Sequence, residues 1–207
     1  MDSARIDGIL YDRGAYGQDR DVPAGAVDRR SAVGRVESRV ASYDLREGEA
    51  TYLKPGAPLY AVEGYDPSFR LAARRDGGWA LYEVAHNPGA EKASELLDVG
   101  GKVESIGVED TFEVGNTGPE EVATVRGQEK VGNIVDATLD APLGQISRGS
   151  FRYLVVFHLE DGTRSIRWYE LRSGELYLSE NPSERDPYTG VVLPGAHREA
   201  IRRALPG

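Results

Sequence analysis

The chain has 207 residues, of which 40% are hydrophobic and 29% are charged, with a formal net charge of −9 and no cysteine. Nucleic acid and anionic membrane surfaces are disfavoured as partners, because phosphate binding requires a basic stripe and the basic residues here are interleaved with acidic ones. The absence of cysteine excludes disulfides and thiolate chemistry. No stretch approaches the roughly 20 apolar residues that insert across a bilayer. We expect a soluble protein, cytoplasmic as written, or extracytoplasmic if an N-terminal signal or anchor has been removed.

The first half, residues 1–100, is predicted to be a small β-rich barrel or sandwich. Residues 5–11 form a short strand in this prediction. Residues 12–30 are rich in glycine, proline and aspartate, which predicts a flexible surface segment. The stretch AVGRVESRVA at 32–41 fits either a helix or a strand with a bulge at Gly34, and its β-branched residues favour the strand.

Strand and turn signals become denser after residue 50. Short strands are predicted at residues 51–53, 58–63, 68–74 and 79–84, with turns at Lys54-Pro55-Gly56 and Asp76-Gly77. A helix is expected to open at residues 87–89 and to close near residue 97. The following double glycine, residues 100–101, is predicted to separate the two halves.

The second half, residues 101–207, is predicted to be α+β. Strands are expected at residues 102–109 and 121–126. Residues 128–139 carry apolar side chains at helical spacing, namely Val131, Ile134, Val135 and Leu139. A second helix is predicted at residues 196–205. We expect the first of these helices to cover a sheet formed by residues 151–178.

Residues 151–178 predict a three-stranded antiparallel meander. Asp161-Gly162 is typical of a two-residue type I′ turn. That turn would place Phe157 opposite Ile166 and Val155 opposite Trp168. It would also place three residues together on the other face, which are His158, Arg167 and Tyr169. The predicted fold class is therefore mainly β with a few helices (α+β), in two antiparallel β-rich halves, the second being a meander covered by a helix.

Two segments of this chain resemble a known kind of protein. The segment YLKPGAPLYAVEGYDPSFRLAAR, followed by an Asp-Gly turn and WALYEV, is similar to one found in uncharacterised bacterial proteins that are often exported and anchored to the envelope. The segment FRYLVVFHLEDGTRSIRWYELRSGEL resembles the meander that follows in such proteins. The resemblance covers residues 49–178 and implies an envelope-associated protein, either exported or lipoprotein-anchored. It carries no catalytic motif and implies no known activity.

The sequence contains no recognisable catalytic or metal-binding motif. Its three histidines, His86, His158 and His197, lack the HxH or HxxxH spacing typical of metal ligands. The motifs GxSxG, HExxH and GxGxxG are all missing. We therefore predict no catalytic residues, no metal and no cofactor.

Two groups of residues are candidates for ligand or partner binding. Tyr65, Asp66 and Arg70 lie in one turn, and aromatic and arginine side chains are those that most often anchor interfaces. The alternative is that Asp66 caps its own turn while Phe69 enters the core and Arg70 pairs at the surface.

The second group is His158, Arg167 and Tyr169, the polar residues predicted to share an otherwise apolar face of the meander. A buried arginine on such a face must reach a carboxylate, water or a ligand. The alternative is that His158 is an ordinary half-exposed residue near the end of a hairpin.

These observations favour a non-catalytic binding or interaction module of the bacterial cell envelope, whose partner is an unknown protein or envelope component. The alternative is a hydrolase that uses carboxylates on a β scaffold. Such an enzyme would bring two carboxylates within ~5–10 Å of one another in a cleft, one of them with a raised pKa.

Overall fold

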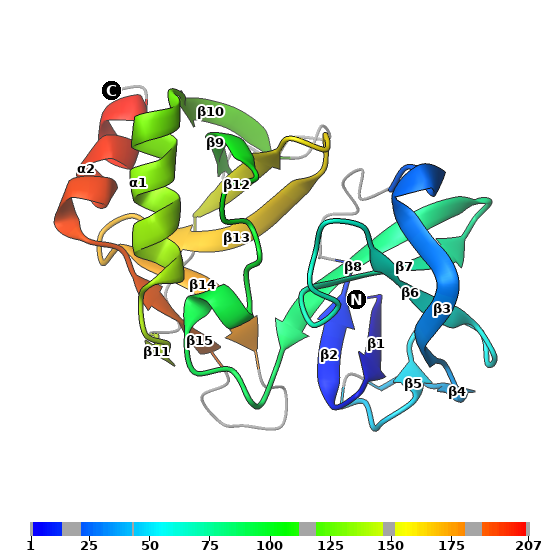
Figure 1. The fold of residues 1–207 in the computed structure, drawn as a ribbon. Helices are drawn as coiled ribbons and strands as arrows, with labels where there is room; N and C mark the ends of the chain where they lie inside the picture. Colours follow the sequence, from blue (N-terminus) through cyan, green and yellow to red (C-terminus); the bar gives the residue numbers. More distant parts are fainter. Residues whose placement is uncertain are drawn as a thin grey trace. The chain divides into compact units, whose positions relative to one another are not determined.

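The computed structural model describes residues 2–13, 22–42, 44–111, 119–146, 152–180 and 188–205. The chain divides into two compact units: unit 1 is Met1–Ala90 with Ser179–Pro187, and unit 2 is Glu91–Leu178 with Tyr188–Gly207. Each unit contains one mostly antiparallel sheet, so the predicted mainly β fold with a few helices is confirmed (Figure 1). The division falls after Ala90, and the double glycine expected at the boundary lies inside unit 2.

Unit 1 contains an eight-stranded sheet in the described residues, with the order β3-β6-β7-β8-β2-β1-β5-β4. Its strands are β1 (Ser3–Ile6), β2 (Ile9–Asp12), β3 (Val27–Arg35), β4 (Ser38–Arg39), β5 (Glu49–Ala50), β6 (Pro58–Val62), β7 (Arg70–Arg75) and β8 (Gly78–His86). The short helix η1 (Ala24–Ala26) precedes β3.

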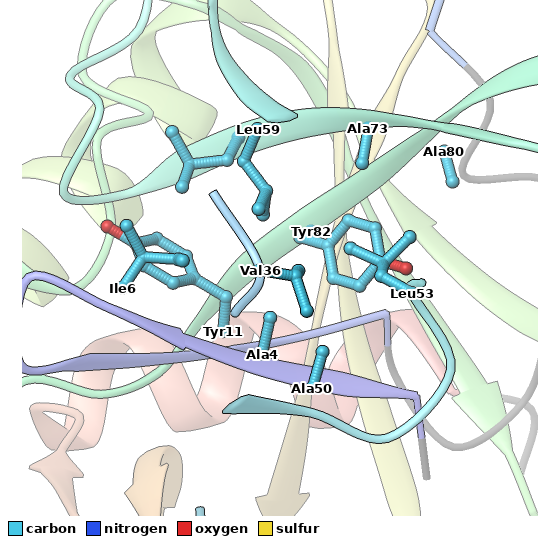
Figure 2. Close-up of a cluster of buried hydrophobic side chains, with 11 residues drawn as sticks. Ala4, Ile6, Tyr11, Val36, Ala50, Leu53, Leu59, Ala73, Ala80 and Tyr82 are labelled. Carbon is cyan, nitrogen blue, oxygen red and sulfur yellow. The ribbon is translucent and has the colours of Figure 1, made fainter. Parts of the chain in front are cut away.

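The sheet of unit 1 curls around one apolar core. Its two end strands, β3 and β4, are separated in the chain only by Val36 and Glu37, so the chain passes directly from one end of the sheet to the other. Figure 2 shows the side chains that gather inside, which are Ala4, Ile6, Tyr11, Val36, Ala50, Leu53, Leu59, Leu71, Ala73, Ala80 and Tyr82. A Cβ atom at Gly34 would lie 2.3 Å from Cγ2 of Ile6, so only glycine permits this close approach of β3 to the core.

The strand prediction for residues 32–41 is confirmed only in part, because β3 ends at Arg35 and β4 forms only at Ser38–Arg39. The pairing of β3 with β6 is irregular between Ala32 and Gly34. The prediction of one strand at residues 5–11 is wrong. The chain reverses at Asp7 and Gly8, whose φ angles of 52° and 76° suit a type I′ turn. Ile6 therefore pairs with Ile9 in a hairpin of β1 and β2.

The segment predicted to be flexible, residues 12–30, lies partly outside the described residues, at 14–21. Its second part is packed, contrary to that prediction. Val22 and Val27 are buried, and the backbone N–H of Val22 donates to the carbonyl of Trp79 at 2.8 Å. Both side chains belong to a second apolar cluster, which includes Ala72. Ala72 and Ala73 are successive residues of β7, so this cluster lies on the opposite face of that strand from the core that contains Ala73. Residues 51–53, predicted to be a strand, form bends instead.

Unit 2 contains a seven-stranded sheet in the described residues, with the order β10-β9-β12-β13-β14-β15-β11. Its strands are β9 (Val103–Asp110), β10 (Glu120–Val125), β11 (Gly144–Gln145), β12 (Tyr153–Leu159), β13 (Arg164–Glu170), β14 (Glu175–Glu180) and β15 (Tyr188–Val192). The helices are η2 (Ala93–Glu95), α1 (Gln128–Leu139) and α2 (Gly195–Ala204).

Helix α1 occupies the residues that the sequence predicts, and it packs against β9, the strand next to the meander (Figure 1). Its buried residues are Val131, Ile134, Val135 and Thr138, whereas Leu139 is half-buried. Helix α2 agrees with the second predicted helix to within one residue at each end. The helix predicted at residues 87–97 is wrong, because only η2 forms there. The Asn87 side chain accepts the N–H of Gly89, which makes a local turn in place of the first helical turn.

The meander is present, but its predicted register is wrong by one residue. Asp161 does not adopt the positive φ that a type I′ turn requires, and only Gly162 does, with φ 80°. The carboxylate of Asp161 instead accepts hydrogen bonds from the backbone N–H and hydroxyl of Thr163. The loop therefore has three residues, with the N–H of Leu159 bonded to the carbonyl of Thr163.

This shift exchanges the faces of β13. Val156 lies opposite Ile166, and Leu154 lies opposite Trp168. Val155 and Phe157 are buried as predicted, but Trp168 is half-exposed on the opposite face. A one-residue change of register has this effect because successive side chains of a strand point to opposite faces.

Candidate functional site

The first predicted binding group is centred on a buried ion pair in unit 1. Arg70 is 0% exposed, and its Nε and Nη2 atoms donate to Oε1 of Glu83 at 2.8 and 2.5 Å. The guanidinium carbon lies 4.5 Å from the ring centre of Tyr65 and 4.9 Å from that of Phe69. The expectation that Arg70 pairs at the surface is wrong, and this arginine has no accessible area with which to contact a partner.

Asp66 closes the turn that leads into β7. Its Oδ1 atom accepts hydrogen bonds from the backbone N–H of Ser68 at 2.8 Å and from the Ser68 hydroxyl at 2.7 Å. The Tyr11 hydroxyl donates to the carbonyl of Pro67 at 2.9 Å, which fixes the same turn to β2. Asp66 is exposed and Tyr65 is half-buried. These contacts are those expected of a structural turn.

The second predicted group is not brought together by the structure. Register places His158 opposite Arg164, whereas Arg167 and Tyr169 point to the other face of the sheet. Arg167 is 6% exposed and Tyr169 is fully buried. Burial raises the pKa of Tyr169 to about 12, although the nearby charges of Arg198 and Arg202 oppose this rise. Of this group, only His158 is accessible.

His158 is part of a polar site that the sequence analysis did not identify. The site consists of five side chains on one face of four neighbouring strands, which we call the His158 site: Glu109 (β9), Glu121 and Thr124 (β10), His158 (β12) and Arg164 (β13). Register explains their convergence, because residues that are opposite one another in an antiparallel pair share a face.

Close contacts join these five side chains into a group of three and a pair. Nε2 of His158 lies 2.7 Å from Oε2 of Glu121. The other carboxylate oxygen of Glu121 accepts a hydrogen bond from the hydroxyl of Thr124 at 2.6 Å. On the neighbouring strands, Nη1 of Arg164 lies 3.5 Å from Oε1 of Glu109. Glu109 and Glu121 are themselves cross-strand partners.

Gly107 provides the space in which the side chains of His158 and Glu121 meet. A Cβ atom at this position would be 2.3 Å from Oε2 of Glu121 and 2.8 Å from Nε2 of His158. The histidine and the carboxylate therefore meet directly above the α-carbon of Gly107, on a strand where any larger residue would separate them.

The electrostatics of Glu121 favour its ionised form. Partial burial raises the pKa of this carboxyl group, but the hydrogen bonds from Thr124 and His158 and the charges of His158 and Arg126 outweigh burial and lower the pKa overall. Glu121 is therefore an acceptor of hydrogen bonds at neutral pH.

The site is accessible, although one member is not. The side chains of His158, Glu121 and Arg164 are 29%, 32% and 28% exposed, whereas Glu109 is 4% exposed. Together they offer donors and acceptors within a few ångströms of one another. A period-two pattern in β9 is the sequence signal that could have revealed this face, because Gly107 and Glu109 alternate with buried Ile106 and Val108.

The described part of the chain contains no group of three or more histidine or acidic side chains placed to hold a metal ion. Within the same residues, no helix is both long and apolar enough to cross a membrane.

Comparison with known proteins gives no assignment: no family model, no curated protein and no solved structure matches this chain.

Proposed function

We propose that this protein is a non-catalytic binding module of the bacterial cell envelope, and that its ligand engages the His158 site. The observation that supports this proposal most directly is the His158–Glu121 pair, which lies above Gly107 and is about one-third exposed. An ionised carboxylate, an imidazole and a guanidinium on one sheet face can recognise a ligand rich in hydrogen-bond donors and acceptors.

The protonation state of Glu121 argues against the hydrolase alternative. A carboxylate-dependent hydrolase needs one carboxylic acid that keeps its proton near neutral pH, and therefore a raised pKa. The pKa of Glu121 is lowered instead. Its cross-strand neighbour Glu109 is only 4% exposed and lies beside Arg164, so it offers little accessible surface to a substrate.

The envelope location of this proposal derives from the resemblance of residues 49–178 to exported and anchored bacterial proteins. The partner is accordingly an envelope component or an envelope protein. A folded unit with accessible polar residues on one sheet face fits a role in recognition, and a nucleic-acid partner is disfavoured by the net charge of −9.

Binding of envelope extracts and of a glycan and peptide panel tests the proposal. We expect His158→Ala and Glu121→Gln to weaken binding by about tenfold each, since each removes a charge-assisted hydrogen bond. Glu129→Gln is the matched control, because it removes the same charge from an exposed position on α1. Equal binding by both site variants and the wild-type protein would exclude the site. Turnover of any panel member that depends on Glu121 would support the hydrolase alternative.

A further inference from the structure

An exposed tyrosine in unit 1 is surrounded by arginine side chains. Tyr52 is 50% exposed and is one of two exposed large hydrophobic residues in the described part of the chain. The guanidinium carbons of Arg39 and Arg75 lie 5.7 and 4.9 Å from the centre of its ring. Both distances are within the range of cation–π contacts, so two positive charges lie against the Tyr52 ring.

Arg35 and Lys54 extend this surface along the segment 51–56, and Arg39 contacts the same segment. Nη1 of Arg35 donates to the carbonyl of Gly56 at 3.3 Å, at one end of the segment. Nε of Arg39 donates to the carbonyl of Thr51 at 3.1 Å, at the other end. Lys54 lies between them in the sequence and is exposed. We call Arg35, Arg39, Tyr52, Lys54 and Arg75 the tyrosine patch.

A tight turn fixes the middle of the patch. The N–H of Ala57 donates to the carbonyl of Lys54 at 3.0 Å, and Gly56 has a φ of 85°. Proline at the second position and glycine at the third are typical of a type II turn, so the predicted Lys54-Pro55-Gly56 turn is confirmed. The patch is therefore built from the YLKPG stretch of the segment that resembles envelope proteins.

The charges of the patch are not balanced within the structure. Arg75 forms ion pairs with Asp2 and Asp76. By contrast, across the ranges that the structure describes, no carboxylate lies within ion-pair distance of three cations of the patch, which are Arg35, Arg39 and Lys54. The nearby Glu37 side chain lies against Gly48 on another turn. In a chain with a net charge of −9, three uncompensated cations beside an exposed ring form a local site for anionic groups.

We propose that the tyrosine patch binds an acidic segment of a partner polypeptide. Carboxylates of that segment would pair with Arg35, Arg39 and Lys54, and one apolar side chain would cover the Tyr52 ring. A peptide fits better than a densely charged polymer, because the net charge of −9 repels a long polyanion and because the exposed ring requires an apolar cover. This binding surface is separate from the His158 site and does not depend on it.

Fluorescence anisotropy with a labelled peptide of four Glu-Glu-Phe repeats tests this inference at low ionic strength. We expect the wild-type protein to bind the peptide, and both Arg39→Gln and Tyr52→Ala to weaken binding at least tenfold. Lys130→Gln is the charge-matched control at an exposed position on α1 and should bind like the wild type. Arg39→Lys retains the charge and should lose less affinity than Arg39→Gln. Thermal unfolding of each variant verifies that the fold is intact.

Any of the following results would overturn the inference: no binding by the wild-type protein, binding by both patch variants that equals that of the wild type, or binding of a Gln-Gln-Phe peptide that equals that of the Glu-Glu-Phe peptide. Preferential binding of inorganic polyphosphate would also overturn it, because that result would identify a densely charged polymer as the ligand. His158→Ala should leave peptide binding unchanged, so failure here and failure of the proposed function can be distinguished.

Discussion

Arg70 with Glu83 in unit 1, and His158 with Glu121 in unit 2, are two ion pairs in opposite settings. Arg70 and Glu83 are 0% and 1% exposed, and two aromatic rings flank the guanidinium. His158 and Glu121 are about one-third exposed, and their side chains meet above the α-carbon of Gly107. The first pair is tied to the fold, because neither charge can reach water. The second can exchange its partner for a ligand at small cost, because water already reaches it.

The largest expected effect comes from breaking the buried pair. Arg70→Ala leaves the Glu83 carboxylate in the interior without its arginine, and we expect the free energy of unfolding to fall by about 3–5 kcal/mol. Urea denaturation measures this change. The double variant Arg70→Met, Glu83→Leu removes both charges and should recover much of the loss. A single variant that is less than about 1 kcal/mol destabilised would contradict this reading.

A smaller effect is expected at Gly34, inside the core of unit 1. The Cβ of Gly34→Ala would meet Cγ2 of Ile6 at 2.3 Å, and the packed core around Ile6 leaves little room to move. We expect a loss of about 1–3 kcal/mol, the usual cost of overpacking. Gly132→Ala on α1 is the control, because its Cβ meets nothing within 4 Å. That change should stabilise the helix by roughly 0.5–1 kcal/mol. If Gly34→Ala and Gly132→Ala changed the melting temperature equally, the close approach of Gly34 to Ile6 would be contradicted.

Gly107→Ala should change stability by less than about 1 kcal/mol, because the atoms in its way are the ends of the His158 and Glu121 side chains, which can turn aside. The contact between those side chains should nevertheless be lost. An NMR titration of the Glu121 carboxyl group should detect the loss as a rise of its pKa towards the ordinary value, because the hydrogen bond and the charge of His158 help to lower that pKa. Ligand binding at the His158 site should fall as well, and a wild-type titration curve in the variant would disprove the role given to Gly107.

The smallest effect concerns pH. The folded-state pKa of Glu121 is below the ordinary value of 4.5, so ionised Glu121 stabilises the fold above that pH, and the contribution is lost as pH falls through the folded-state pKa. The difference in melting temperature between wild type and Glu121→Gln should therefore be constant near neutral pH and shrink in acid. A difference that grows in acid would reverse the sign of the interaction.

Two Asp-Gly turns show how far local sequence could predict the fold. Asp76 and Gly77 both have positive φ, and the two-residue turn expected there forms, with Arg75 opposite Gly78. Asp161-Gly162 has the same dipeptide but forms a three-residue loop, because the Asp161 side chain bonds to Thr163. The residue after the glycine, Thr163 in this loop, therefore affects the loop length, and the Asp-Gly dipeptide alone does not determine the register of the hairpin.

That one-residue difference explains why the candidate site was only partly predicted. His158 was identified, but the expected register placed Arg167 and Tyr169 beside it instead of Arg164. Its partner Glu121 is 37 residues away in sequence, on the strand beyond β9, and no local pattern reports such a pairing.

The sequence by itself determined the mainly β class, helix α1 and the Lys54-Pro55-Gly56 turn, because periodicity and turn residues act over a few positions. Only the tertiary structure decided which charged residues are buried and which are accessible. Arg70 is buried because Glu83 and two rings enclose it, and His158 meets Glu121 because Gly107 leaves room between their strands. Both facts depend on strand register and long-range packing, which are properties of the assembled sheets.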